Sequence, residues 1–152
     1  AVAVDPSPRG LAYVFFENGK LLDWGHRRCG RSETEVLAFL GELLAGCAAD
    51  LLVIEDPDAE GAKRWRRSSR LLRKMANRAR TLEVAVFPTS RRKVRLHWVA
   101  RGLSTKESVA VALAAQFPEL ASLVPPRRKT WMSEHPNSSI FDALTLLLHA
   151  CS

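Results

Sequence analysis

The sequence of 152 residues has little cysteine and no long hydrophobic run. Its three cysteines, Cys29, Cys47 and Cys151, include no CxxC pair, which argues against a disulfide framework or a zinc site and is typical of a reducing cytosol. No apolar run reaches the ~18 residues of a membrane-spanning helix. The first apolar stretch is interrupted at Asp5 and has no basic leader, so we expect no signal peptide and a cytoplasmic location.

Acidic residues are almost absent from residues 60–80, which carry nine lysines and arginines and one acid, Glu60. This segment has a net charge of +8 and the whole chain +7, so the other residues together carry −1. A basic block without a lipidation signal indicates a nucleic-acid partner rather than a membrane. We expect phosphate contacts from this block and from a second basic patch in or next to a loop, through Arg66, Arg67, Arg70, Lys74, Arg91, Arg92 and Lys93.

The order of periodic segments predicts a single α/β domain, residues 1–152, with a mixed sheet covered by helices on both faces. Three antiparallel strands come first, and Asn18-Gly19 is a hairpin signal between the second and the third. We expect strands at residues 1–5, 11–17, 20–24, 51–55 and 82–87, the fourth parallel to the first, and a basic loop at 26–31.

Four helices are expected, at about residues 32–47, 62–80, 104–115 and 137–150. Their expected caps are Ser32 or Thr34, a Ser104-x-x-Glu107 capping box, and Asn137 or Ser138. The basic helix at 62–80 should be amphipathic, with its less polar side formed by Trp65, Ser68, Leu72, Met75, Ala76 and Ala79. Trp98 and Trp131 are candidates for stacking on bases, although packing is the simpler role for each.

Three acids stand where elements begin or end. Asp5 ends the first buried strand, Glu55 ends the strand LLVIE, and Asp142 is expected in the first turn of the last helix, where the dipole favours negative charge. A buried ionised carboxylate needs a partner or a cation. Carboxylates are the ligands that Mg²⁺ prefers, so we expect these three to converge on Mg²⁺ or Mn²⁺, with Asp56 an alternative to Glu55. Such a site beside basic segments predicts phosphodiester hydrolysis.

Four motifs follow one another along the chain: Asp5-Pro6-Ser7-x-Arg9 before Tyr13, then Glu55, Gly102-x-x-x-Lys106-x-x-Val109, and Asp142-Ala143-Leu144. Together they resemble the RNase H-like superfamily, specifically its RuvC-like branch of Holliday-junction resolvases. The resemblance covers nearly the whole chain and implies an Mg²⁺-dependent endonuclease of DNA recombination and repair that cuts branched DNA. It adds Lys106 to the expected nucleic-acid contacts. Paired cuts across a junction would imply a homodimer.

The chain departs from that branch at two positions. Ser7 replaces a glycine after Asp5, and Ser139 stands where the branch has a fourth ligand, although serine is a poor Mg²⁺ ligand. Three explanations compete: the site works with three carboxylates, Glu134 or His135 supplies the fourth ligand, or the site is catalytically weakened. His135 is also a candidate general acid–base.

Two other functions compete with the nuclease. The first is an RNase H-like nucleic-acid-binding module that has lost catalysis, which Ser139 and the basic segment favour and the three carboxylates oppose. The second is an actin- or Hsp70-like ATPase, which the sequence disfavours because its eight glycines form no phosphate-binding cluster.

Overall fold

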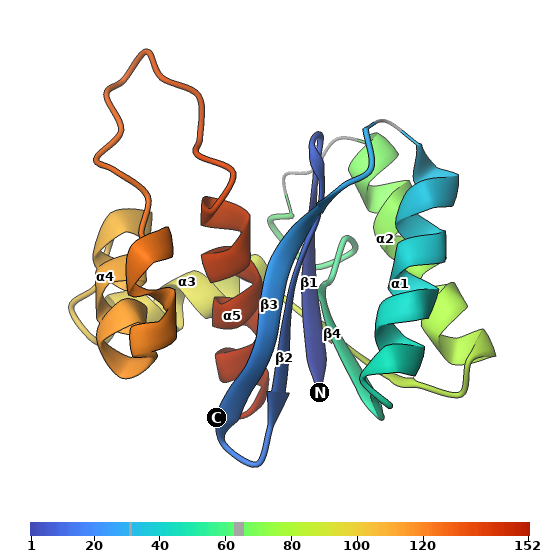
Figure 1. The fold of residues 1–152 in the computed structure, drawn as a ribbon. Helices are drawn as coiled ribbons and strands as arrows, with labels where there is room; N and C mark the ends of the chain where they lie inside the picture. Colours follow the sequence, from blue (N-terminus) through green and yellow to red (C-terminus); the bar gives the residue numbers. More distant parts are fainter. Residues whose placement is uncertain (31, 63–65) are drawn as a thin grey trace.

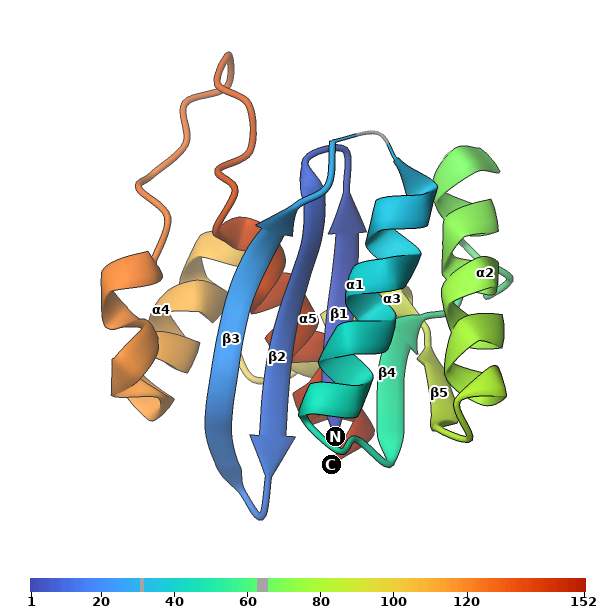
Figure 2. The ribbon, with the colours of Figure 1, turned by 45° about the vertical axis from the view of Figure 1, so that its right-hand side comes forward.

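A computed structural model describes residues 1–30, 32–62 and 66–152 of the chain. At its centre is a five-stranded mixed sheet in the order β3-β2-β1-β4-β5, with helices on both faces (Figure 1, Figure 2). The strands are β1 (Val2–Ser7), β2 (Gly10–Glu17), β3 (Lys20–Arg28), β4 (Leu51–Glu55) and β5 (Ala85–Thr89). The helices are α1 (Glu33–Gly46), α2 (Arg66–Thr81), α3 (Arg91–Val99), α4 (Lys106–Gln116) and α5 (Ser138–Ala150), with a 3₁₀ helix, η1 (Pro118–Leu123). The predicted α/β mixed sheet is confirmed.

The central strand, β1, contributes to a hydrophobic core on each side of the sheet. It pairs antiparallel with β2 and parallel with β4, as predicted. Val2 and Val4 belong to the core under α1 and α2, whereas Ala3 belongs to the core under α5. α5 contacts the sheet directly, and α3 and α4 pack on α5 (Figure 1). Because side chains alternate along a strand, Asp5 lies on the same side as Ala3.

The structure has one α-helix that was not predicted, α3, and it changes the cap of another, α4. Residues 90–95 were expected in or next to a loop, but they begin α3, with Ser90 as N-cap accepting a hydrogen bond from the Lys93 backbone N–H at 3.4 Å. The buried pair Val94 and Trp98 gives α3 an i, i+4 apolar side that its basic residues obscure. α4 is capped by Thr105 rather than Ser104, because Thr105 has the extended backbone and the reciprocal bonds with Ser108.

The strand boundaries differ where pairing overrides the local pattern. β3 continues through the expected basic loop to Arg28, because β2 pairs with it as far back as Gly10. A Cβ on Gly10 would lie 1.9 Å from the carbonyl oxygen of Arg27, so this close approach requires glycine. The fifth strand starts at Ala85 rather than at residue 82, because α2 runs to Thr81 and is followed by a turn with a positive φ at Glu83.

The basic helix α2 has the predicted amphipathic character. Its buried residues are Leu72, Met75, Ala76 and Ala79, four of the six residues expected on the less polar side. The predicted helix began near Ala62, which lies outside α2, and Trp65 falls outside the described residues. Among the helices of the described ranges, none is both long and apolar enough to cross a membrane.

We predict that Leu144→Ala destabilises the fold strongly. Leu144 lies on α5, is completely buried in the core under that helix, and its truncation would leave a cavity. The expected loss in the free energy of unfolding is about 2–5 kcal/mol. Urea unfolding followed by circular dichroism measures it, with Val111→Ala, on the half-exposed side of α4, as a control that should change stability by about 0.5 kcal/mol or less. Equal losses in both variants would contradict the role of α5 as core.

Candidate active site at the carboxyl edge of the sheet

The first two acids are brought together by the parallel pairing of β1 and β4. The register matches Ala3 with Val53, so Asp5 and Glu55, each two residues further along, reach the same level of the sheet on the same face. Both side chains are buried, with Asp5 at 4% and Glu55 at 3% exposure. Ala3 and Val53 belong to the core under α5, so this is also the face that α5 covers.

The third acid, Asp142, comes from α5 itself. The helix begins at Ser138 and has no acid in its first turn, so the expected placement of Asp142 in that turn is wrong. Asp142 lies one turn further in, on the part of α5 that packs near the ends of β1 and β4, and its side chain is 15% exposed. The structure thus brings the three predicted acids to one place.

The guanidinium of Arg91 lies among the three carboxylates. Its Nη2 donates to Asp5 Oδ1 at 2.7 Å and its Nε to Glu55 Oε2 at 2.9 Å, while its Nη1 lies 3.7 Å from Asp142 Oδ2. Burial lowers the pKa of Arg91, but the fields of the three carboxylates outweigh it and raise the pKa above the usual value. Arg91 was expected to contact nucleic acid, and in this structure its guanidinium pairs with the three acids.

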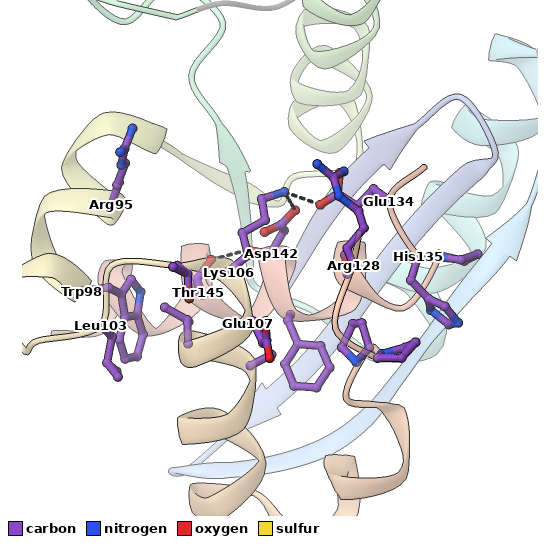
Figure 3. A pocket seen from close by; sticks show the side chains of 18 of the residues that line it. Arg95, Trp98, Leu103, Lys106, Glu107, Arg128, Glu134, His135, Asp142 and Thr145 are labelled. Atoms are coloured by element: carbon purple, nitrogen blue, oxygen red, sulfur yellow. Dashed lines mark hydrogen bonds and ion pairs between the residues drawn. The ribbon is translucent and has the colours of Figure 1, made fainter. Parts of the chain in front are cut away.

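Lys106 is a second cation at the edge of this cluster. Its ammonium donates to Asp142 Oδ2 at 3.0 Å and also to Glu134 (Figure 3). Burial lowers the pKa of Lys106, whereas the charge of Asp142 and the hydrogen bond with Glu134 raise it, and the balance is a raised pKa. Glu134 therefore reaches the site through Lys106 rather than by joining the three carboxylates directly.

The other two positions that the sequence singled out, His135 and Ser139, lie just before α5 and in its first turn. His135 is exposed, and its Nδ1 accepts a hydrogen bond from the Asn137 backbone N–H at 3.2 Å. In Figure 3 its ring is turned away from the group formed by Asp142, Lys106 and Glu134. Ser139 occupies the first turn of α5, three residues before Asp142 and on the same side of the helix.

The three carboxylates are the candidate ligands for the predicted divalent metal ion. Carboxylate oxygens from Asp5, Glu55 and Asp142 are the right kind of ligand, and their joint contact with one guanidinium shows that they can surround a cation. Within residues 1–30, 32–62 and 66–152, however, no group of three His, Cys, Asp or Glu side chains has a spacing that could hold a metal ion. The chemistry of the site fits Mg²⁺ or Mn²⁺, and binding would require Arg91 to give up contacts with the acids.

A cavity of about 860 Å³ opens beside the acid cluster. Its walls come from α3, α4, α5 and the segment 125–136, part of the long connection between η1 and α5 that projects from the molecule (Figure 1, orange to red). Arg91 and Asp142 belong both to its lining and to the acid cluster. Sequence reasoning missed this cavity, because its walls come from elements that are far apart in the sequence.

The predicted nucleic-acid contacts fall into two groups. Arg70 and Lys74 on α2 pair with Glu33 of α1, at 3.1 and 2.8 Å, so part of the basic surface is neutralised within the protein. Arg66 and Arg67 are exposed at the start of α2, at the end of the molecule toward which β1 and β4 run (Figure 2). Arg92 and Lys93 are exposed in the first turn of α3, next to Arg91.

Comparisons with known proteins bear on the fold. No protein-family model matches the chain, and no curated protein sequence matches it. Solved structures do match it. Among them is RuvC of Thermus thermophilus, with a TM-score of 0.62 and 18% identity over 99% of this chain and 94% of that one. Another is T. thermophilus RuvC in complex with a Holliday junction substrate, with a TM-score of 0.58 and 16% identity over 99% of this chain and 93% of that one. The chain therefore has the RNase H-like fold in its RuvC-like form.

Proposed function

We propose that this protein is a metal-dependent endonuclease that hydrolyses phosphodiester bonds in branched or otherwise structured DNA. The observation that carries the proposal is the convergence of Asp5, Glu55 and Asp142, from three separate elements, around one positive group. The likeness in fold to RuvC bound to a Holliday junction supports a branched DNA substrate. Two active sites facing the two strands of a junction would require a homodimer.

The proposed mechanism assigns the three carboxylates to Mg²⁺ or Mn²⁺. When bound, the ion would activate a water molecule and neutralise charge on the scissile phosphate. Lys106, already 3.0 Å from Asp142, would place its ammonium beside a phosphate held at this edge. Arg91 would leave the carboxylates when the ion binds, and its guanidinium would then be available to the same phosphate.

The alternative function is a nucleic-acid-binding module without catalysis. Two observations favour it: Arg91 already pairs with the carboxylates, and Ser139 stands at the position of a fourth ligand. In that case the acid cluster and Arg91 would form a structural ion network, and the exposed basic residues would still bind phosphates. Cleavage in the presence of a divalent metal separates the two functions.

The first prediction is metal-dependent cleavage that requires Asp5. Labelled four-way junction, flap, linear duplex, RNA–DNA hybrid and single strands would be incubated with Mg²⁺, Mn²⁺ or EDTA. We expect cutting of the junction with metal, none with EDTA, and a loss of at least about a hundredfold in Asp5→Asn, because a ligand is removed. Asp50→Asn, which changes a 93% exposed acid, is the matched control and should cut normally. Tight binding without cutting in either metal would favour the binding module.

The second prediction concerns Arg91→Gln. Removing the cation leaves buried carboxylates close together and should cost about 3 kcal/mol of stability in EDTA. The deficit should be large near pH 7, where the like charges repel one another, and should shrink as the pH falls to about 4, where bound protons replace the lost cation.

Metal should reverse that deficit, since Mg²⁺ would neutralise the same carboxylates. We expect Mg²⁺ to raise the melting temperature of Arg91→Gln near pH 7 by several degrees more than that of the wild type. Arg92→Gln, which changes the exposed neighbour on α3, is the control and should melt like the wild type. A deficit that metal leaves unchanged would argue against a metal site on these carboxylates.

The third prediction concerns the exposed cations at the start of α3. Arg92→Gln and Lys93→Gln should each weaken junction binding in EDTA and lower the slope of log K against log salt by about 1, because each removes one phosphate contact. Fluorescence anisotropy over a salt series measures the slope. Lys20→Gln, at the exposed start of β3, is the control and should keep the wild-type slope. Unchanged slopes in the α3 variants would contradict a phosphate contact at the start of α3.

A further inference from the structure

We propose that the cavity beside the acid cluster is a binding pocket for one unstacked nucleotide of the DNA strand, next to the phosphate that is cut. This inference rests on the proposed function and assigns one nucleotide of the DNA substrate to this cavity. The cavity of about 860 Å³ is within the range of small-molecule sites, ~300–1,000 Å³, and exceeds what a side chain would fill.

The inner wall of the cavity suits a planar apolar group. Trp98 from α3, Phe141 from α5 and Leu103 from the α3–α4 connection line it, and the first two are buried in the core. Such a surface gives a base the apolar and aromatic contact that it loses on leaving the stack. The exposed side chain of Met132, on the opposite wall, adds an adaptable apolar surface.

Two cations at the cavity suit the phosphates on either side of such a nucleotide. Arg95 on α3 and Arg128 on the η1–α5 connection both line the cavity and are exposed (Figure 3). Neither makes an ion pair with any other residue of the described ranges, in contrast to Arg91 and Lys106. Their positive charge is thus available to an anionic ligand.

The cavity is continuous with the acid cluster. Arg91 and Asp142 form part of its lining, so a nucleotide inside would keep its own phosphate near the carboxylates. The connection that forms the opposite wall is tied to the site: Glu134 pairs with Lys106 through its side chain and accepts a hydrogen bond from Arg9 Nη1 at 3.1 Å through its backbone oxygen. The pocket is therefore built next to the proposed chemistry.

The experiment uses a four-way junction with 2-aminopurine at the branch point or one nucleotide to either side, titrated in EDTA so that no cutting is needed. This base brightens when it leaves the stack. We expect emission at one of these positions to rise several-fold at saturation with the wild type. Met132→Glu puts a negative charge in the cavity and should abolish most of the rise, whereas Leu22→Glu, on β3, should keep it. The two sites are matched in exposure, 46% and 48%.

Junction binding without brightening at any position, or equal brightening in Met132→Glu and Leu22→Glu, would overturn the nucleotide pocket and leave the proposed nuclease intact. Absence of junction binding by the wild type would overturn both.

Discussion

Three carboxylates, of which Asp5 and Glu55 are buried, share one guanidinium at the carboxyl edge of the sheet, and the arrangement of the site depends on this contact. Asp5 and Glu55 are almost fully shielded from water, so each needs a positive partner to stay ionised. Arg91 reaches both, and its contact with Asp142 links α5 to the ends of β1 and β4. Whatever binds here must offer at least the same positive charge, which favours a divalent ion over a neutral ligand.

The backbone makes that contact possible through two simple constraints. Parallel pairing puts the ends of β1 and β4 at one edge, and a register of Ala3 with Val53 puts two acids at one level. β5, parallel to β4, then delivers the chain to Ser90, which caps α3 and sets Arg91 as its first residue. Arg91 thus enters the cluster because of where a strand ends and a helix begins.

The charge pattern acquires a different meaning once the partners are known. Residues 60–80 form the most basic segment, yet Arg70, Arg73 and Lys74 pair with acids of α1 or of the β4–α2 connection, Glu33 and Asp58. The cations that remain exposed near the acid cluster belong to shorter basic stretches, in α3 and in the connection before α5. A sum over the sequence counts charges, whereas phosphate binding depends on those that have no internal partner.

The sequence by itself determined the mixed sheet, its central parallel pair, the amphipathic α2 and the three acids, because apolar periodicity marks the elements and each acid interrupts or ends an apolar stretch. Only the tertiary structure decided the role of Arg91, the separation of His135 from the acids and the cavity beside Trp98. Arg91 is 86 residues from Asp5, and no local pattern encodes which distant charge will meet it. The cavity likewise depends on how a connection without regular structure packs against three helices, which periodicity does not describe.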